Sequence, residues 1–258
     1  MKTVTSKDGT EIAFEKSGEG PALIIVGGSL ADHQFYAPLA NELAKHFTVY
    51  NFDRRGRGQS GDARVYAVER EIEDVAALID LAKEPVFLYG HSAGSALALR
   101  AAATGLNIAK LALADPPFTP RDENDEAAKA ELAKESARIK ELHSKGDYKG
   151  SVKFFLGGMG LSDEDIEGIL ESPAGGGMID SARALPYDYS MLGDGLVPTN
   201  LAAKVTVPTV ILAAKAMPET AQALADVMPN AQHRTLEGQT HEVAAEALAP
   251  VLVEFFQA

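Results

Sequence analysis

The sequence predicts an α/β protein, with a mainly parallel central sheet, helices on both faces and an inserted helical segment. Short apolar runs of buried-strand type alternate with helical patterns along most of the chain. This alternation is typical of a parallel sheet covered on both faces. It stops at Pro116 and Pro117, where the composition shifts to Ala, Glu and Lys. We therefore expect one core formed by residues 1–117 and 201–258, with a helical cap at 118–200.

The expected elements follow from hydrophobic periodicity. The strands are predicted at 10–16, which alternates, and at the continuous apolar runs 22–26, 48–52, 85–89, 109–114, 207–212 and 232–236. Helices are predicted at 35–46, 69–82, 92–104, 220–227 and 243–256, and at 121–145 within the insertion, where Leu132, Ile139 and Leu142 recur at helical spacing. Gly105 ends the third of these helices.

Composition limits the class of function. The chain has 258 residues, 46% of them apolar, which suits one globular core. With 37 acidic and 24 basic residues the net charge is −13, which argues against nucleic-acid or anionic-membrane partners. There is no cysteine, so disulfides and thiolate chemistry are excluded. No apolar run resembles a signal peptide or a membrane span, so we expect a cytoplasmic protein. We expect it to be a monomer or a homodimer.

A strong chemical signal is Gly90-His91-Ser92-Ala93-Gly94, which lies between an apolar strand and an Ala-rich helix. A sharp strand-to-helix turn would expose the Ser92 hydroxyl above the sheet and turn His91 away from it. Glycines at both ends of the motif would let the backbones approach closely. The alternative is that Ser92 is a plain helix N-cap.

The chain resembles the α/β-hydrolase family. The resemblance rests on the serine motif and on three segments: 21–28, although Val26 stands where the family has histidine; Asp53-Arg-Arg-Gly-Arg-Gly-Gln-Ser60; and Gly238-Gln-Thr-His241 after the last strand. It implies that Ser92 is the nucleophile and that His241 is the general base, since a serine hydroxyl needs a base to attack an acyl carbon. It also implies an oxyanion hole formed by the backbone N–H groups of Gly28 and Ala93.

The third member of the triad departs from the family pattern. Met217 occupies the usual position of the acid, and a methionine cannot orient an imidazole. Some members place the acid after the preceding strand, where this chain has Asp115. We predict Asp115, with Glu219 as the rival. Arg54, Arg55 and Arg57 are interpreted as a solvated or structural cluster.

The resemblance implies a small-molecule apolar substrate, a carboxylic ester, thioester or lactone that is hydrolysed through an acyl-enzyme. Serine as nucleophile argues against haloalkane dehalogenase and epoxide hydrolase chemistry. No metal-ligand spacing and no dinucleotide motif occurs, so neither a metal nor another cofactor is expected. Alternatives on the same scaffold are a lyase, a cofactor-free oxygenase or a ligand receptor that keeps the triad. The candidate pocket residues, which could equally form the core of the cap, are Phe118, Phe154, Phe155, Met159, Met178, Tyr187 and Met191.

Overall fold

A computed structural model of the chain describes residues 1–63, 65–121, 125–214 and 218–258. Within these ranges an eight-stranded sheet runs in the order β1-β2-β4-β3-β5-β6-β7-β8. The pairs β1–β2 and β2–β4 are antiparallel, and the other five neighbouring pairs are parallel. This arrangement confirms the predicted fold class. The strands are β1 (Lys2–Thr5), β2 (Glu11–Ser17), β3 (Ala22–Val26), β4 (Thr48–Phe52), β5 (Val86–His91), β6 (Ile108–Ala114), β7 (Thr209–Ala213) and β8 (Ala231–Thr235). The mostly exposed edge strand β1 was not predicted, because too few of its residues are apolar.

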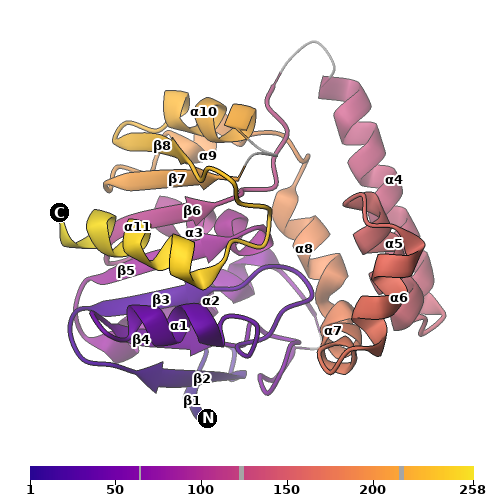
Figure 1. Cartoon of the computed structure of the whole chain (residues 1–258), viewed down its shortest axis with the longest axis horizontal. Coiled ribbons are helices and arrows are strands. Elements are labelled where there is room, and N and C mark those ends of the chain that lie inside the picture. The colour runs from indigo at the N-terminus through magenta and orange to yellow at the C-terminus, as the bar shows by residue number, and fades with distance from the viewer. Residues whose placement is uncertain (64, 122–124, 215–217) are drawn as a thin grey trace.

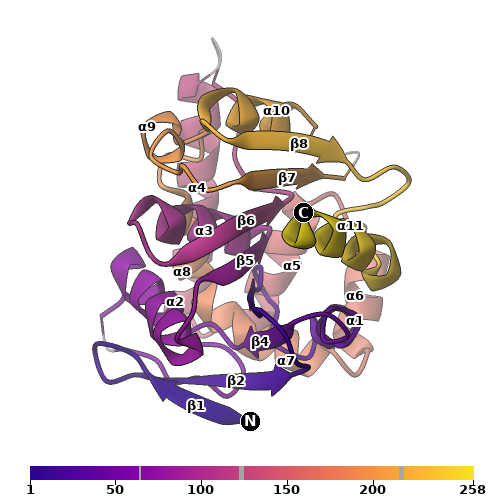
Figure 2. The same cartoon turned by 90° about the vertical axis from the view of Figure 1, so that its left-hand side faces the viewer.

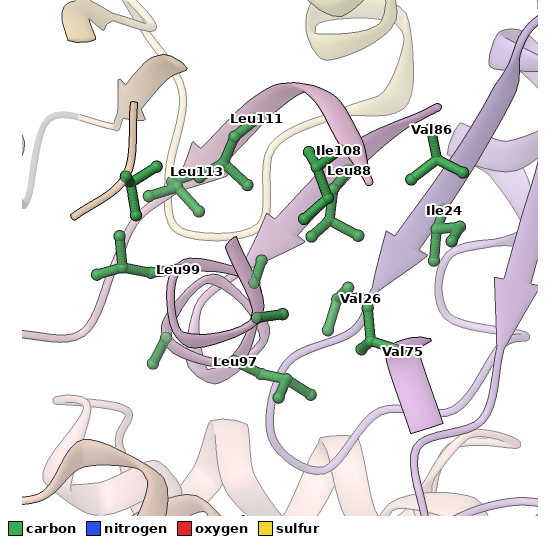
Figure 3. Close-up of a cluster of buried hydrophobic side chains, with 14 of the residues drawn as sticks. Ile24, Val26, Val75, Val86, Leu88, Leu97, Leu99, Ile108, Leu111 and Leu113 are labelled. Atoms are coloured by element: carbon green, nitrogen blue, oxygen red, sulfur yellow. The ribbon is translucent and has the colours of Figure 1, made fainter. Parts of the chain in front are cut away.

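Helices cover both faces of this sheet, and Figure 2 shows them on its two sides. One face carries α2 (Val68–Ala82), α3 (Ala93–Ala103), α9 (Thr199–Ala202) and α10 (Pro218–Val227), and the other carries α1 (Ala37–Leu43) and α11 (Ala245–Gln257). The first of these interfaces packs aliphatic side chains from β3, β5 and β6 against α2 and α3 (Figure 3). The central strands are buried on both faces, which explains their continuous apolar runs.

The remaining helices lie beside the sheet rather than on its faces (Figure 1). They are α4 (Asp125–Ser144), α5 (Tyr148–Gly158), α6 (Asp163–Glu171), α7 (Gly175–Ser181), the 3-10 helix η1 (Ala182–Ala184) and α8 (Leu185–Leu192). We call this the α4–α8 segment. It has an apolar cluster of its own, which includes Ile139, Val152 and Leu185. A β-bridge between Thr119 and Leu196 joins the two stretches of chain that enter and leave this segment.

The sheet brings two loops together at its carboxyl edge. In the register of β5 and β6, His91 lies opposite Ala114. The next residues along the chain, Ser92 and Asp115, therefore leave adjacent parallel strands at the same level. The Ser92 N–H donates to the Ala114 carbonyl oxygen at 2.9 Å, which fixes the two loops to each other. In the part of the chain described, no helix is both long and apolar enough to cross a bilayer.

Candidate active site

Ser92 occupies a strained turn between β5 and α3. Its φ of 52° and ψ of −126° lie in a region that residues other than glycine rarely adopt. The flanking glycines are needed for close packing: a Cβ on Gly90 would lie 2.6 Å from the Gly94 carbonyl oxygen, and one on Gly94 would lie 2.1 Å from the Val26 carbonyl oxygen. Such distances are not tolerated by real side chains. The glycines therefore let β5, α3 and the end of β3 meet beneath the serine.

The loop after β8 brings His241 to the same edge. Its Nδ1 lies 3.1 Å from Oδ2 of Asp115, whose other oxygen, Oδ1, accepts the Ala214 N–H at 2.7 Å. The Asp115 side chain is 1% exposed and its φ is 43°, another strained loop conformation. Because a carboxylate can only accept, Nδ1 of His241 donates to Asp115, and Nε2 is the ring nitrogen left for another partner.

The rival acid lies elsewhere. Glu219 is exposed in the first turn of α10, where the helix dipole stabilises an acidic side chain. Met217, at the family's usual position, lies outside the described residues. The structure thus places Asp115, and not Glu219, against the imidazole of His241.

Ser92 and His241 line one pocket, which lies between the carboxyl edge of the sheet and the α4–α8 segment. Of the predicted pocket residues, Phe155, Met159 and Met178 line it. The loop after β3 supplies further walls that the sequence analysis missed, Leu30 and Phe35 among them. The sequence could have indicated these residues, because they follow a core strand and the loops after parallel strands surround the binding sites of such sheets.

The other predicted pocket residues do not line it. Phe118 and Met191 are buried in the core between the sheet and its helices. Phe154 packs against the apolar cluster of the α4–α8 segment. Tyr187 stacks on Tyr66, with ring centroids 3.9 Å apart, and donates its hydroxyl to Asp62. These four residues serve packing and attachment in this structure.

The loop after β3 gives the N–H of Gly28, one of the two expected oxyanion donors, an acceptor within the protein. The Gly28 N–H donates to the Tyr36 hydroxyl oxygen at 2.7 Å, so it already has an acceptor. The next residue, Ser29, lies on the pocket wall. Ala93 begins α3, and the first N–H groups of a helix have no acceptor within the helix. Gly28 and Ser29 both line the pocket, and because the Gly28 N–H already has an acceptor, the Ser29 N–H is the candidate donor from this loop beside Ala93.

The arginines after β4 are buried rather than solvated. Arg54 makes two bonds to Glu71, of 2.7 and 3.0 Å, and its Nη1 lies 2.8 Å from Asp188 of α8. Arg57 lies 2.6 Å from the same Asp188 oxygen. Burial alone would raise the pKa of Asp188, but Arg57 and Arg54 lower it below its usual value. This buried ion network joins the α4–α8 segment to the core.

Acidification is expected to destabilise the fold through His91. Burial, helped by the nearby His241, lowers the pKa of His91 to about 4. An unfolded histidine titrates near ~6.5, so the unfolded state binds more protons between these values. The free energy of unfolding therefore falls as pH drops through this window, by up to about 3 kcal/mol. Urea unfolding of the wild type and of His91→Gln at pH 7, 5.5 and 4.5 checks this. Equal pH slopes for the two proteins would contradict it.

Comparison with known proteins agrees with this geometry. Residues 23–252 match the family model described as the alpha/beta hydrolase family. A solved alpha/beta hydrolase from Sphaerobacter thermophilus is 44% identical, with a TM-score of 0.86, over 99% of this chain and 100% of that one. The chain therefore belongs to the alpha/beta hydrolase family, a family of hydrolytic enzymes.

More distant relatives are also hydrolases. An esterase from Thermogutta terrifontis is 22% identical, with a TM-score of 0.74, over 99% of this chain and 97% of that one, and shares the fold. N-formylmaleamate deformylase from Pseudomonas putida is 36% identical over 106 residues, 40% of each chain. The pimeloyl-[acyl-carrier protein] methyl ester esterase of Xanthomonas oryzae is 32% identical over 142 residues, 54% of this chain and 53% of that one. The chain spans between about a third and about half the length of the curated relatives that it matches.

Proposed function

We propose that the protein is a serine hydrolase that cleaves a carboxylic ester, thioester or lactone through an acyl-enzyme. The observation that carries the proposal is the shared pocket of Ser92 and His241, with Nδ1 of His241 held by the buried Asp115. The similarity to proteins named as an esterase and as a methyl ester esterase supports the same class of reaction.

The proposed reaction uses each group in turn. His241 Nε2 takes the Ser92 hydroxyl proton as the oxygen attacks the acyl carbon. The N–H groups of Ser29 and Ala93 stabilise the oxyanion that forms. The tetrahedral intermediate collapses when His241 returns the proton to the leaving alcohol, which leaves the acyl group on Ser92. Water, activated by His241, then releases the acid and restores the serine.

Labelling with a fluorophosphonate tests the nucleophile. We expect one adduct, located on Ser92 by peptide mass, because this serine lies on a strained turn and shares the pocket with His241, its proposed base. Ser92→Ala should lose the adduct. Ser29→Ala is the matched control, since this second serine on the pocket wall contributes a backbone N–H and should leave the adduct in place. An adduct on any other residue, or none on the wild type, would refute the assignment.

Turnover distinguishes the proposal from the other activities of the scaffold. A panel of p-nitrophenyl esters of increasing acyl length, with a thioester, a lactone and an N-formyl amide, should show repeated release of acid. The amide enters the panel because of the similarity to the deformylase. A lyase would instead yield a carbonyl product, and a receptor would stop after one turnover.

Substitution of a pocket wall is expected to change acyl preference. Phe155→Ala enlarges the pocket, so the ratio of kcat/KM for long over short acyl groups should rise by about 10- to 100-fold, since hydrophobic pockets discriminate by about this much. Phe154→Ala is the matched control, because Phe154 packs against the same apolar cluster as Phe155 but is not among the residues that line the pocket. A shift with Phe154→Ala and none with Phe155→Ala would show that the wall is wrongly assigned.

A further inference from the structure

His91 makes a hydrogen-bonded connection that the proposed reaction does not use. It precedes Ser92, but its side chain is turned away into the protein and is 6% exposed. Its Nε2 lies 2.9 Å from the main-chain carbonyl oxygen of His241, and its Nδ1 lies 2.9 Å from the Tyr36 hydroxyl. The two imidazole rings are 4.9 Å apart between centroids.

The partners fix the direction of every bond in this connection. A carbonyl oxygen can only accept, so Nε2 of His91 carries the proton. Burial and the neighbouring His241 lower the pKa of His91 to about 4, and a neutral ring then has Nδ1 as an acceptor. The Tyr36 hydroxyl must donate to it, while the Tyr36 oxygen accepts from the Gly28 N–H. The bonds thus run from Gly28 to Tyr36, from Tyr36 to His91 and from His91 to the backbone of His241.

The groups around His91 keep this arrangement neutral at physiological pH. Asp115, behind His241, favours the protonated ring, but burial and His241 outweigh it. Glu242 lines the same pocket as His91. Burial raises the pKa of Tyr36, so its hydroxyl stays un-ionised. His91 can therefore hold its two partners without carrying a charge.

The backbone that receives the bond belongs to a loop in which Gln239 and Thr240 bond to groups of the same loop or its flanks. The residues before His241, Glu237, Gly238 and Thr240, are exposed, and the edge strand β8 that precedes them is largely exposed as well. Loops of this kind are mobile unless something holds them. Asp115 fixes the side chain of His241, whereas His91 fixes its main chain from beneath.

We propose that His91 is a positioning residue, which holds the His241 loop in register with the serine turn, while Tyr36 donates to its Nδ1 and ties it to the loop after β3. This inference rests on the proposed function, because it assigns His91 a role through His241. Since a displacement of about 1 Å at a reacting group costs about 100-fold in rate, loss of the bond should lower kcat more than it changes KM.

Two amide substitutions separate positioning from packing. In His91→Gln the side-chain amide reaches the place of Nε2 and can still donate to the His241 carbonyl. In His91→Asn the amide reaches only the place of Nδ1, so the contact with Tyr36 survives and the bond to His241 is lost. We expect His91→Asn to lower kcat and the rate of fluorophosphonate labelling by about 10- to 100-fold, whereas His91→Gln retains most of both.

The outcomes are distinguishable. An unlabelled, inactive wild type would refute the proposed function itself. If the wild type is active, equal rates for the two folded variants, whether high or low, would overturn the positioning role, as would a slower His91→Gln. Should His91→Asn fail to fold, nitrogen NMR of the wild type with labelled histidine decides. A proton on Nε2 and none on Nδ1 of His91 from pH 6 to 8 is the expected result, and the reverse tautomer overturns the proposal.

Discussion

Asp115→Asn is expected to lower kcat by about 10⁴-fold, the loss that follows when the acid of a Ser-His-Asp triad is neutralised. The carboxylate of Asp115 accepts a hydrogen bond from Nδ1–H of His241 and would stabilise the imidazolium that forms when Ser92 is deprotonated. An asparagine is uncharged and can present an N–H to Nδ1, which favours the wrong tautomer. Steady-state kinetics with an ester that the wild type turns over measures the loss, with Ser92→Ala as the inactive baseline.

The matched control for this variant is Glu219→Gln. Glu219 is exposed at the start of α10, and the structure gives it no place at the imidazole, so near-normal turnover is expected. Circular dichroism and thermal unfolding establish that both variants are folded. If Asp115→Asn turned over normally while Glu219→Gln did not, the acid would have been assigned to the wrong loop.

Asp188→Ala is expected to lower the free energy of unfolding by about 3–5 kcal/mol, the usual cost of removing one partner from a buried ion pair. One oxygen of Asp188 lies within hydrogen-bond distance of both Arg54 and Arg57, whose side chains are at most 1% exposed. Glu71 would remain beside Arg54, but the two buried guanidinium groups would lose the carboxylate that they share, and their charges would be less well compensated. Urea unfolding at neutral pH measures the loss.

An exposed ion pair gives the comparison. Asp180 and Arg183 lie 3.8 Å apart with side chains 77% and 61% exposed, so Asp180→Ala should change stability by no more than about 0.5 kcal/mol. A similar small change for Asp188→Ala would mean that the buried network contributes little to the fold.

Features that repeat along the chain were predictable, because periodicity reports burial directly. The apolar runs located the core strands, and the glycines around Ser92 located the turn on which it lies. Asp115 could be proposed from sequence because the carboxyl ends of neighbouring parallel strands share one edge. The structure then placed its carboxylate against His241.

Features that depend on a partner distant in sequence were not predictable. Nothing near Gly28 indicates that its N–H donates to a tyrosine in the following loop. Arg54 and Arg57 carry charges that normally face water, and the buried partner that they share, Asp188, lies more than 130 residues further along the chain. Among the aromatic residues of the insertion, Phe154 and Phe155 are neighbours, and only the packing of α5 decides which of them lines the pocket.

The α4–α8 segment has a consequence for how this enzyme could diversify. Most of its apolar side chains pack against one another, and α8 carries the charged attachment to the core. Substitutions of Phe155 or Met178 on α5 and α7 therefore reshape the pocket wall, whereas Asp115 and His241 lie on loops of the sheet and keep their hydrogen bond. These helices could be lengthened, shortened or exchanged as long as Asp188 and its arginines keep α8 attached to the core. Substrate choice could then evolve separately from the reaction.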